Sequence, residues 1–287
     1  MPDTTDTAPV LRVRDLSVTY GTNVAVKHAN LEVRPGERVA IVGESGSGKT
    51  SLGNAIAGFL DLDAGRVDVD TLELQGTALD RSGRGAPRIP RRTPGLSMIF
   101  QDAMSSLDPV WTIGSQLTAV LRETENVSRA QAKKDALEWL RRVGITDPER
   151  VMHAKPGELS GGMRQRVMMA IALSSKPALL IADEPTSALD ASLAVGAMKL
   201  MVELAEREGT AVLMITHDIE LCRKFTDFVI VMYHGEIVEQ ISSSELSNAK
   251  DPYTRGLLEC VPTLASARLD ELPTLESVRA RLEGTAA

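Results

Sequence analysis

The sequence predicts an α/β fold, in which a mostly parallel β-sheet is joined by an antiparallel β subdomain and a helical insertion subdomain. Between Val10 and Val42, short runs alternate apolar and polar residues between turn residues, which is typical of β-strands. From Ser160 onward, helical patterns alternate with short apolar runs, and this alternation implies parallel strands joined by right-handed crossovers. The region between them is largely helical from Ile113 to Val143.

The composition is that of a globular chain. Of 287 residues, 43% are hydrophobic and 25% are charged, and the net charge is −7. A general nucleic-acid binder needs clustered lysine and arginine, so the acidic balance argues against that class. The only cysteines, Cys222 and Cys260, form no CxxC motif, which argues against a disulfide framework or a zinc site. We expect a soluble chain, because the sequence shows neither signal-peptide features nor an apolar run of about 18 residues.

The first third of the chain predicts strands, then a loop, then a helix. Strand patterns lie in LRVRDLSVTY, NVAVKHANLEV and ERVAIV, and they are separated at Gly21 and at Pro35–Gly36. Short strand patterns return in GRVDV and TLELQG. The helix follows the glycine-rich segment after Val42, and four apolar residues share one of its faces at helical spacing: Leu52, Ile56, Phe59 and Leu60.

The ends of the later helices are predicted from helix-capping residues and from proline. Within the helical insertion, Ser128 is expected as an N-cap and Gly144 as a C-cap. A helix that begins after Ser160 is expected to end near Pro177. The elements expected after it are a strand at 178–183, a helix at 193–208, a strand at 210–216, a helix at 218–226 and a strand at 227–233.

A phosphate-binding loop is indicated by the segment GESGSGKT, which fits G-x-x-x-x-G-K-[ST] after an apolar strand and before an amphipathic helix. Glycines let the backbone amides surround the β- and γ-phosphates, and the following helix points its positive end at them. Lys49 is expected to neutralise phosphate charge, and the Thr50 hydroxyl to ligate Mg²⁺. The fold is then of the RecA-like P-loop NTPase type, and the expected ligand is a purine nucleoside triphosphate. The nucleotide-binding residues expected in this segment are Gly43, Glu44, Ser45, Gly46, Ser47, Gly48, Lys49, Thr50 and Ser51.

Two carboxylates follow a strand that is apolar throughout. Asp183 and Glu184 come directly after ALLIA, so they lie at the carboxyl end of a buried parallel strand, where open α/β sheets bind ligands. Asp183 is expected to hold Mg²⁺, directly or through water. Glu184 is the candidate general base for a water molecule that attacks the γ-phosphate.

The motifs together resemble those of the ATP-binding subunits of ABC transporters. The segment Leu159-Ser160-Gly161-Gly162-Met163 is similar to the LSGGQ signature of that family, with methionine in the position of glutamine. Ser160 is a natural N-cap, and the amides of Gly161 and Gly162 open a helix toward an anion. In the family this helix end faces the γ-phosphate bound by a second subunit. The resemblance therefore implies a dimer that holds two ATP molecules between its subunits.

The resemblance implies roles for four further residues. Tyr20 resembles the aromatic residue that stacks on adenine. Gln101 matches the glutamine that touches Mg²⁺ and the attacking water while its loop contacts the membrane partner. Asp190, in Ser187-Ala188-Leu189-Asp190, matches the acidic residue of the loop that reaches across the dimer. His217 matches the histidine that contacts the γ-phosphate and helps to position the base and the water.

Two segments resemble one subfamily, the ATPases of oligopeptide, dipeptide and nickel importers. MIFQDAMSSLDP, at 98–109, is similar to their extended glutamine loop, and DPYTRGLLECVP, at 251–262, is similar to the block after their ATPase core. The domain organisation expected from the resemblance is an ATPase domain at 10–245, with its helical subdomain at about 105–163, and a C-terminal extension at 246–287.

The expected function is ATP hydrolysis that drives the uptake of peptides, or of nickel or metal chelates. The implied partners are a second ATPase subunit (the same chain or a paralogue), two transmembrane permease subunits and an extracytoplasmic solute-binding protein, with no nucleic acid. The chain is then expected at the cytoplasmic face of the membrane as a peripheral subunit. Two alternatives stay open: an ATPase subunit of another ABC transporter class, and a soluble ABC-type ATPase. Solute identity is not encoded in this chain, because partner subunits select it.

Overall fold

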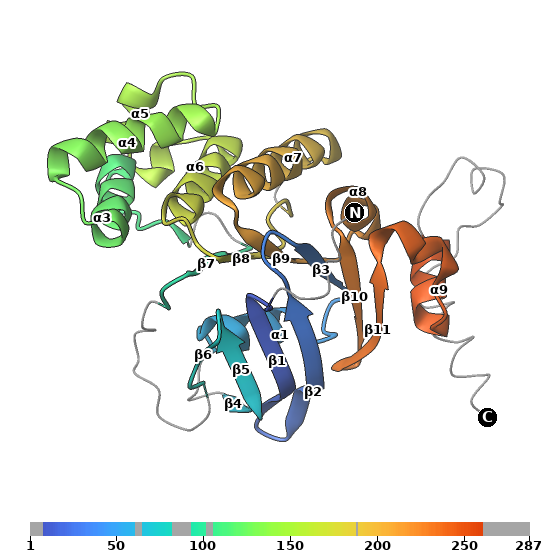
Figure 1. Ribbon diagram of the computed structural model, residues 1–287. Helices are drawn as coiled ribbons and strands as arrows, with labels where there is room; N and C mark the ends of the chain where they lie inside the picture. Colours follow the sequence, from blue (N-terminus) through green and yellow to red (C-terminus); the bar gives the residue numbers. More distant parts are fainter. Residues whose placement is uncertain (1–7, 61–64, 82–92, 102–105, 188, 261–287) are drawn as a thin grey trace.

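The computed structural model describes residues 8–60, 65–81, 93–101, 106–187 and 189–260. Two β-sheets are stacked with one helix between them, and a layer of helices covers the far face of the larger sheet (Figure 1). A separate group of helices lies at one end of that layer. This arrangement confirms the predicted α/β fold with its antiparallel and helical parts.

The larger sheet has six strands in the order β11-β10-β3-β9-β8-β7. All of its pairings are parallel except that of β10 with β11, which is antiparallel. Every residue of β8 and β9 is buried, as parallel strands covered on both faces must be. The edge strand β11 is absent from the elements that the sequence predicts. The strands are β3 (Arg38–Val42), β7 (Leu96–Ile99), β8 (Leu179–Asp183), β9 (Ala211–Thr216), β10 (Phe228–Tyr233) and β11 (Glu236–Ser242).

Helices cover both faces of this sheet. The helix α1 (Lys49–Ala57) contacts strands of both sheets and lies between them. Three helices pack on the opposite face: α6 (Gly161–Ser174), α7 (Ala191–Glu208) and α8 (Ile219–Phe225). The sheet is therefore enclosed, and the carboxyl ends of its parallel strands form the edge from which the loops to the helices emerge.

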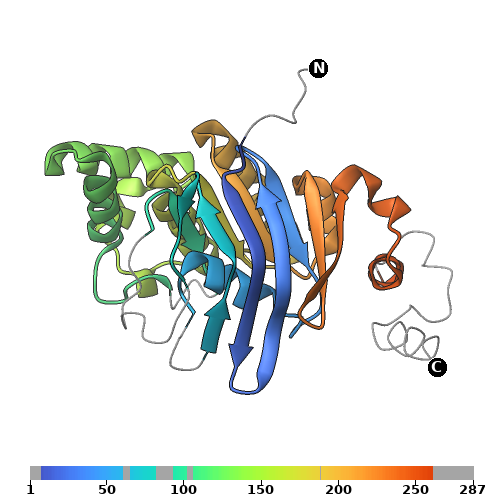
Figure 2. The ribbon, with the colours of Figure 1, turned by 60° about the horizontal axis from the view of Figure 1, so that its bottom comes forward.

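The second sheet is antiparallel and is built around a long hairpin, shown in blue in Figure 2. Its strands bury alternate residues, which is the period-two pattern of the sequence. The hairpin turns at Gly21, whose φ of 59° lies in the left-handed region. The strands are β1 (Leu11–Tyr20), β2 (Asn23–Val33), β4 (Gly65–Asp68), β5 (Thr71–Leu74) and β6 (Thr77–Ala78).

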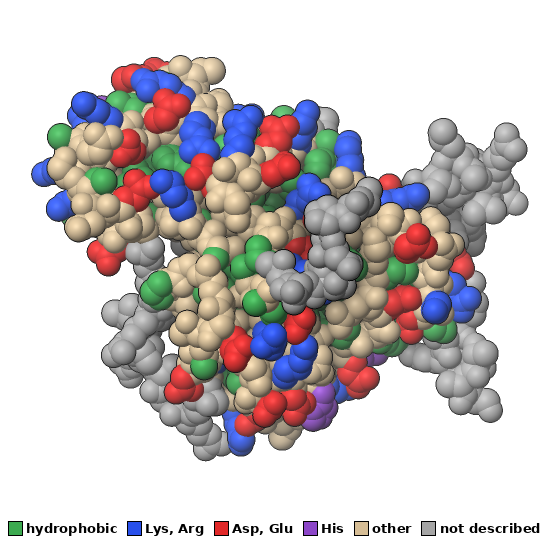
Figure 3. Space-filling view, viewed as in Figure 1, with side chains coloured by type: hydrophobic (Ala, Val, Ile, Leu, Met, Phe, Trp, Pro, Cys, Tyr) green, Lys and Arg blue, Asp and Glu red, His purple; other side chains and the backbone are tan. Residues whose placement is uncertain are grey.

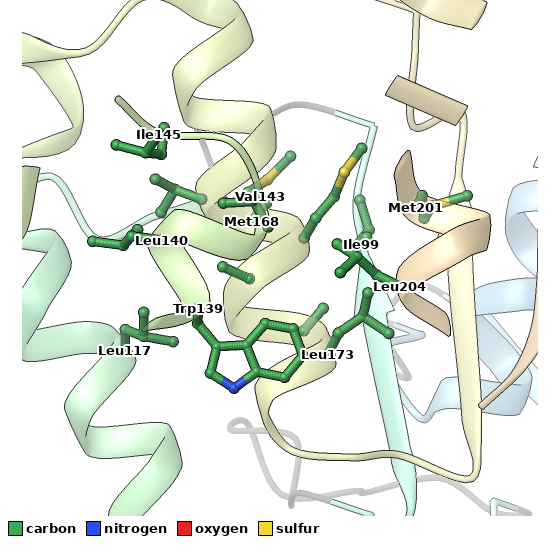
Figure 4. Packing of buried hydrophobic residues seen from close by; sticks show 14 of the residues in the cluster. Ile99, Leu117, Trp139, Leu140, Val143, Ile145, Met168, Leu173, Met201 and Leu204 are labelled. Atoms are coloured by element: carbon green, nitrogen blue, oxygen red, sulfur yellow. The ribbon is translucent and has the colours of Figure 1, made fainter. Parts of the chain in front are cut away.

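The helical lobe contains α3 (Ile113–Glu125), α4 (Arg129–Arg142) and α5 (Pro148–His153). Ser128 accepts a hydrogen bond from the Gln131 amide as the predicted N-cap of α4. Val143 is the C-cap, and Gly144 follows it with a φ of 76°. Figure 4 shows the indole of Trp139 among apolar side chains of α3, α4 and α6. The helix α6, which begins within the signature segment 159–163, therefore shares one core with the helical lobe. The proposed boundaries of this subdomain, 105–163, stay a prediction.

The last described residues form two short helices beside β11. These are a 3₁₀ segment, Ser243–Asn248, and α9 (Pro252–Glu259); another 3₁₀ turn, Pro156–Glu158, precedes α6. Asp251 caps α9 by accepting hydrogen bonds from the Tyr253 and Thr254 amides. The division of the chain at residue 245 stays a prediction, and 261–287 lie outside the described residues.

One packing expectation is wrong. Phe59 does not share the buried face of Leu52 and Ile56, because α1 ends at Ala57 and Gly58 turns the chain with a φ of 81°. Leu52 and Ile56 are fully buried, whereas 40% of Phe59 is exposed. Its ring meets that of Phe100 edge to face, with centroids 5.0 Å apart.

An ion pair joins the first residue of β3, Arg38, to Asp227, which directly precedes β10, and it gives a pH-dependent prediction. The Arg38 guanidinium donates to Asp227 at 2.6 and 3.0 Å. Burial alone raises the pKa of Asp227, but the hydrogen bonds and charge of Arg38 outweigh it and lower the pKa. A carboxylate with a lowered folded-state pKa stabilises the fold above about pH 4 and loses that contribution as pH falls through the folded pKa.

We therefore expect Asp227→Asn to lower the free energy of unfolding by about 1 kcal/mol at pH 7, since both side chains are partly exposed. The loss should be smaller at pH 3 than at pH 7, because a larger share of the parental Asp227 is protonated as the pH falls toward its lowered folded-state pKa. Urea unfolding at both pH values measures this difference. An equal loss at both values would contradict the assignment.

Candidate nucleotide site

The glycine-rich segment connects β3 to α1 with a backbone that only glycine adopts freely. Gly43 and Gly48 have φ values of 154° and 100°. A Cβ at Gly43 would lie 2.2 Å from the Met232 carbonyl oxygen, and one at Gly48 would lie 2.2 Å from that of Ala25. The neighbouring chain thus packs directly on the loop. This close approach fixes the loop in place at the positive end of α1.

Lys49 folds back over this loop. Its Nζ donates to the carbonyl oxygens of Gly43 at 2.8 Å and Glu44 at 2.7 Å. Only 5% of the residue is exposed, and burial lowers its pKa against the opposing charges of Glu184 and Asp183. Ser45 and Gly46 are exposed in the middle of the loop. The loop therefore combines an exposed middle part with a buried cation next to it, at the positive end of α1, and this combination suits phosphate binding.

Thr50 and Asp183, which come from different elements, are in contact with each other. The Thr50 Oγ1 donates to Asp183 Oδ1 at 3.3 Å, so the start of α1 lies against the end of β8. Burial raises the pKa of Asp183, while the Thr50 hydrogen bond and the Lys49 charge oppose that rise. A hydroxyl and a carboxylate are hard oxygen donors, which fit Mg²⁺. No group of three or more acidic, histidine or cysteine residues suited to a metal occurs within the described chain.

Glu184 gathers two of the other predicted residues. Its Oε2 accepts from Gln101 Nε2 at 3.1 Å, and its Oε1 lies 3.2 Å from His217 Nδ1. Both carboxylate oxygens of Glu184 are therefore within hydrogen-bonding distance of a predicted site residue. Gln101 follows β7 and His217 follows β9, so these side chains meet because their strands flank β8 in the sheet.

The backbone of Glu184 is strained. Its φ is 42°, which is uncommon for a residue with a side chain, while its amide still donates to the Ile215 carbonyl oxygen at 2.8 Å. Residues held in such conformations cluster at functional sites. The strain leaves the carboxylate beyond the strand, with about 20% of the side chain exposed.

Tyr20 lies beside the start of α1, at the end of β1. Its hydroxyl is 3.3 Å from the Ser51 Oγ. A Cβ at Gly65 would lie 3.0 Å from the Tyr20 ring, so glycine allows the ring to rest there. Adenine stacking by Tyr20 stays a prediction.

Ser160 and Asp190 cap helices away from the phosphate loop. Ser160 Oγ accepts from the Met163 amide at 3.3 Å, and Asp190 Oδ1 accepts from the Leu193 amide at 3.1 Å. Ser160 and Gly161 are exposed at the start of α6, and Gly162 is partly exposed. Among the described residues, Ser160 makes no hydrogen bond with the phosphate loop. The helix end is thus accessible to an anion from outside the subunit.

Two contacts of the site were missed by sequence reasoning. Buried Gln165 donates from Nε2 to the Pro185 carbonyl oxygen and so ties the signature helix to the segment after Glu184. A glutamine within the otherwise apolar face of that helix is the signal that could have indicated it. The Glu44 amide donates to the Tyr253 hydroxyl, a contact between residues 209 positions apart that no local pattern indicates.

The comparisons with known proteins agree with this geometry. The family description "ABC transporter" matches residues 26–187. A probable peptide ABC transporter ATP-binding protein of Sinorhizobium fredii is 42% identical over 94% of this chain and 82% of its own. The oligopeptide transport ATP-binding protein OppD of Bacillus subtilis is 41% identical over 93% and 75%.

Solved structures show the same fold. A dimeric ATP-binding cassette in a post-hydrolysis state, bound to ADP and Pi, is similar with a TM-score of 0.68 and 28% identity over 81% of this chain and 98% of that one. CbiO1 of Clostridium perfringens, part of the transporter complex cbiONQ, gives a TM-score of 0.68 and 26% identity over 91% and 96%.

Proposed function

Because the chain belongs to the ABC transporter family of ATP-binding proteins, we propose that it is the ATP-hydrolysing subunit of a peptide importer. The observation that supports this most directly is the cluster of Glu184, Gln101 and His217 at adjacent strand ends. The peptide assignment is supported by relatives named for peptide and oligopeptide transport. Nickel and metal chelates stay an alternative cargo.

ATP binding is assigned to the loop from Gly43 to Thr50. The loop amides and the positive end of α1 bind the phosphates, and Lys49 turns its ammonium group from the loop carbonyls to the phosphate oxygens. Tyr20 stacks on the adenine. Thr50, Gln101 and Asp183 would hold Mg²⁺, which would neutralise phosphate charge.

Hydrolysis depends on how Glu184 is held. Its two carboxylate oxygens point to different partners, so Gln101 and His217 fix the plane of the carboxylate. From this position Glu184 polarises a water molecule toward the γ-phosphate. Lys49 and the loop amides stabilise the charge that develops on the phosphoryl oxygens, and His217 contacts the γ-phosphate. Catalysis is then mainly positioning and charge neutralisation.

A second ATPase subunit completes each site. The accessible amides of Gly161 and Gly162, at an N-terminus capped by Ser160, suit the γ-phosphate of an ATP bound by the other subunit. Asp190 belongs to the loop that reaches across this interface. The second subunit is another copy of this chain or a paralogue. ATP binding closes the pair, and hydrolysis with phosphate release reopens it.

We propose that the membrane partners bind at the cleft between the large sheet and the helical lobe. A cavity of about 400 Å³ lies there, lined by apolar groups that include Phe59, Phe100 and Leu107. Next to it, Val110 and Trp111 are 69% and 60% exposed. Such apolar exposure marks contact surfaces. We assign this surface, which adjoins Gln101, to two permease subunits that act with an extracytoplasmic solute-binding protein.

In this proposal the chain is a peripheral subunit at the cytoplasmic face of the membrane. Within the described residues, no helix has the length and apolarity needed to span a bilayer. On the face shown in Figure 3, acidic and basic side chains are interspersed over the helical lobe and the antiparallel sheet. A mixed surface of this kind gives no support to nucleic-acid binding.

Co-purification from membranes tests the proposal. The tagged chain should retain two polytopic membrane proteins and an ATPase subunit, identified by mass spectrometry. Trp111→Ser should lose the membrane proteins and still bind ATP, because it removes an exposed apolar group beside the cleft. Val24→Ser, which alters an exposed apolar residue on the β1–β2 hairpin, is the matched control. Recovery of the chain only from the soluble fraction, without permeases, would favour a soluble ABC-type ATPase.

A further inference from the structure

The helix α9 reaches the phosphate loop through one side chain. Tyr253 is 3% exposed, and its hydroxyl accepts a hydrogen bond from the Glu44 amide at 3.1 Å. Burial raises the pKa of this phenol, so the hydroxyl stays neutral. Glu44 is the second residue of the loop. A helix near the end of the described chain is thus joined directly to the nucleotide site.

The Tyr253 ring is held firmly in this position. It stacks on Tyr233 with ring centroids 4.1 Å apart and an interplanar angle of 30°. Tyr233 is the last residue of β10 and lies next to Met232, whose carbonyl oxygen closes on Gly43. On the other side, the segment that leads into α9 is anchored to β11, because the Lys250 amide donates to Glu239 Oε1 at 2.7 Å. Figure 1 shows α9 beside β11 at the edge of the sheet.

Glu44 is held from two sides by these contacts. Lys49 binds the carbonyl oxygens of Gly43 and Glu44, and Tyr253 binds the Glu44 amide. When Lys49 turns toward ATP, its bonds to the two carbonyls weaken, whereas the Tyr253 bond does not depend on Lys49. Tyr253 is then the side chain that keeps the first turn of the loop in place during nucleotide binding.

We propose that Tyr253 is a positioning residue of the phosphate loop, through which α9 sets the affinity for ATP. The inference rests on the proposed function only in that the loop binds ATP. It gives the C-terminal segment around α9 a defined role, because a partner or a sequence change that shifts α9 alters nucleotide affinity through the Glu44 amide.

Tyr253→Phe tests this with the smallest change, because it keeps the ring and removes the hydroxyl. We expect the Kd for a fluorescent non-hydrolysable ATP analogue and the KM for ATP to rise about five- to tenfold, the effect of about one hydrogen bond. The kcat should change less than about twofold. Hydrogen exchange at the Glu44 amide should become faster in the nucleotide-free protein. Tyr233→Phe is the matched control, since it removes a hydroxyl from the same stacked pair and should leave Kd unchanged.

The possible outcomes separate clearly. Unchanged Kd and unchanged exchange at Glu44 in Tyr253→Phe would overturn the proposal, as would a lower Tm with an unchanged Kd, which indicates a purely structural role. An equal rise in Kd for Tyr233→Phe would also overturn it. The binding and exchange measurements need no hydrolysis or transport, so they decide the role of Tyr253 even if the parental chain drives no peptide uptake.

Discussion

Glu184→Gln is expected to lower the kcat for ATP hydrolysis by about 10²- to 10⁴-fold while leaving the Kd for ATP within about threefold of the parental value. Glutamine has nearly the same size as glutamate. With its amide oxygen turned toward Gln101, it also keeps the hydrogen bond from Gln101 Nε2, but it cannot accept a proton. The phosphate loop and Lys49 are unchanged, so binding persists. Steady-state phosphate release and equilibrium binding of labelled ATP measure the two quantities.

Glu149→Gln supplies the control, because Glu149 is an exposed acidic residue of α5 in the helical lobe and pairs with Arg141 there. Its kcat should equal that of the parent. Hydrolysis by Glu184→Gln at the parental rate would remove Glu184 as the base.

Lys49→Ala is expected to weaken ATP binding by about 30- to 1,000-fold, which corresponds to about 2–4 kcal/mol for the loss of charge-assisted hydrogen bonds to the phosphates. Lys49 is also the buried cation that faces Asp183 and Glu184. Its removal leaves two carboxylates to repel an anionic ligand. Titration with a fluorescent ATP analogue gives the Kd.

Lys199→Ala is the control for charge, since Lys199 is an exposed lysine of α7 that pairs with Glu203. It should bind ATP as the parent does. Binding by Lys49→Ala within threefold of the parent would show that another group neutralises the phosphates, and the loop assignment would then be wrong.

The sequence alone predicts those parts of the site whose backbone conformation is determined by a short segment. The glycine pattern of the phosphate loop predicts a backbone that passes close to other chain segments, and Gly43 and Gly48 have that conformation. Asp183 and Glu184 follow an apolar run that could only be a buried strand. Gln101 and His217 were found through family resemblance, and their meeting at Glu184 depends on the strand order, which places β7 and β9 on either side of β8.

The features that the sequence does not predict depend mostly on contacts between residues that are far apart in the chain. The strand β11 is only partly buried and owes its place to pairing with β10 at the sheet edge, so its own pattern is weak. Phe59 was misplaced because helical periodicity does not show that Gly58 ends α1. Tyr253 lies in the segment 251–262, which resembles a block of the peptide and nickel importer ATPases. Its contact with Glu44 arises only when α9 folds back against β10, so the segment alone does not indicate it.

Peptide uptake by cells that carry the chain in its native transporter tests the central claim most directly. Cells with the parental gene, with Glu184→Gln or with Glu149→Gln receive a labelled mixture of short peptides, and the amount of each variant in the membrane is matched. We expect accumulation in the parent and in Glu149→Gln, and none above background in Glu184→Gln. Equal peptide accumulation in the parent and in Glu184→Gln would contradict the account, because uptake would then not depend on ATP hydrolysis by this chain.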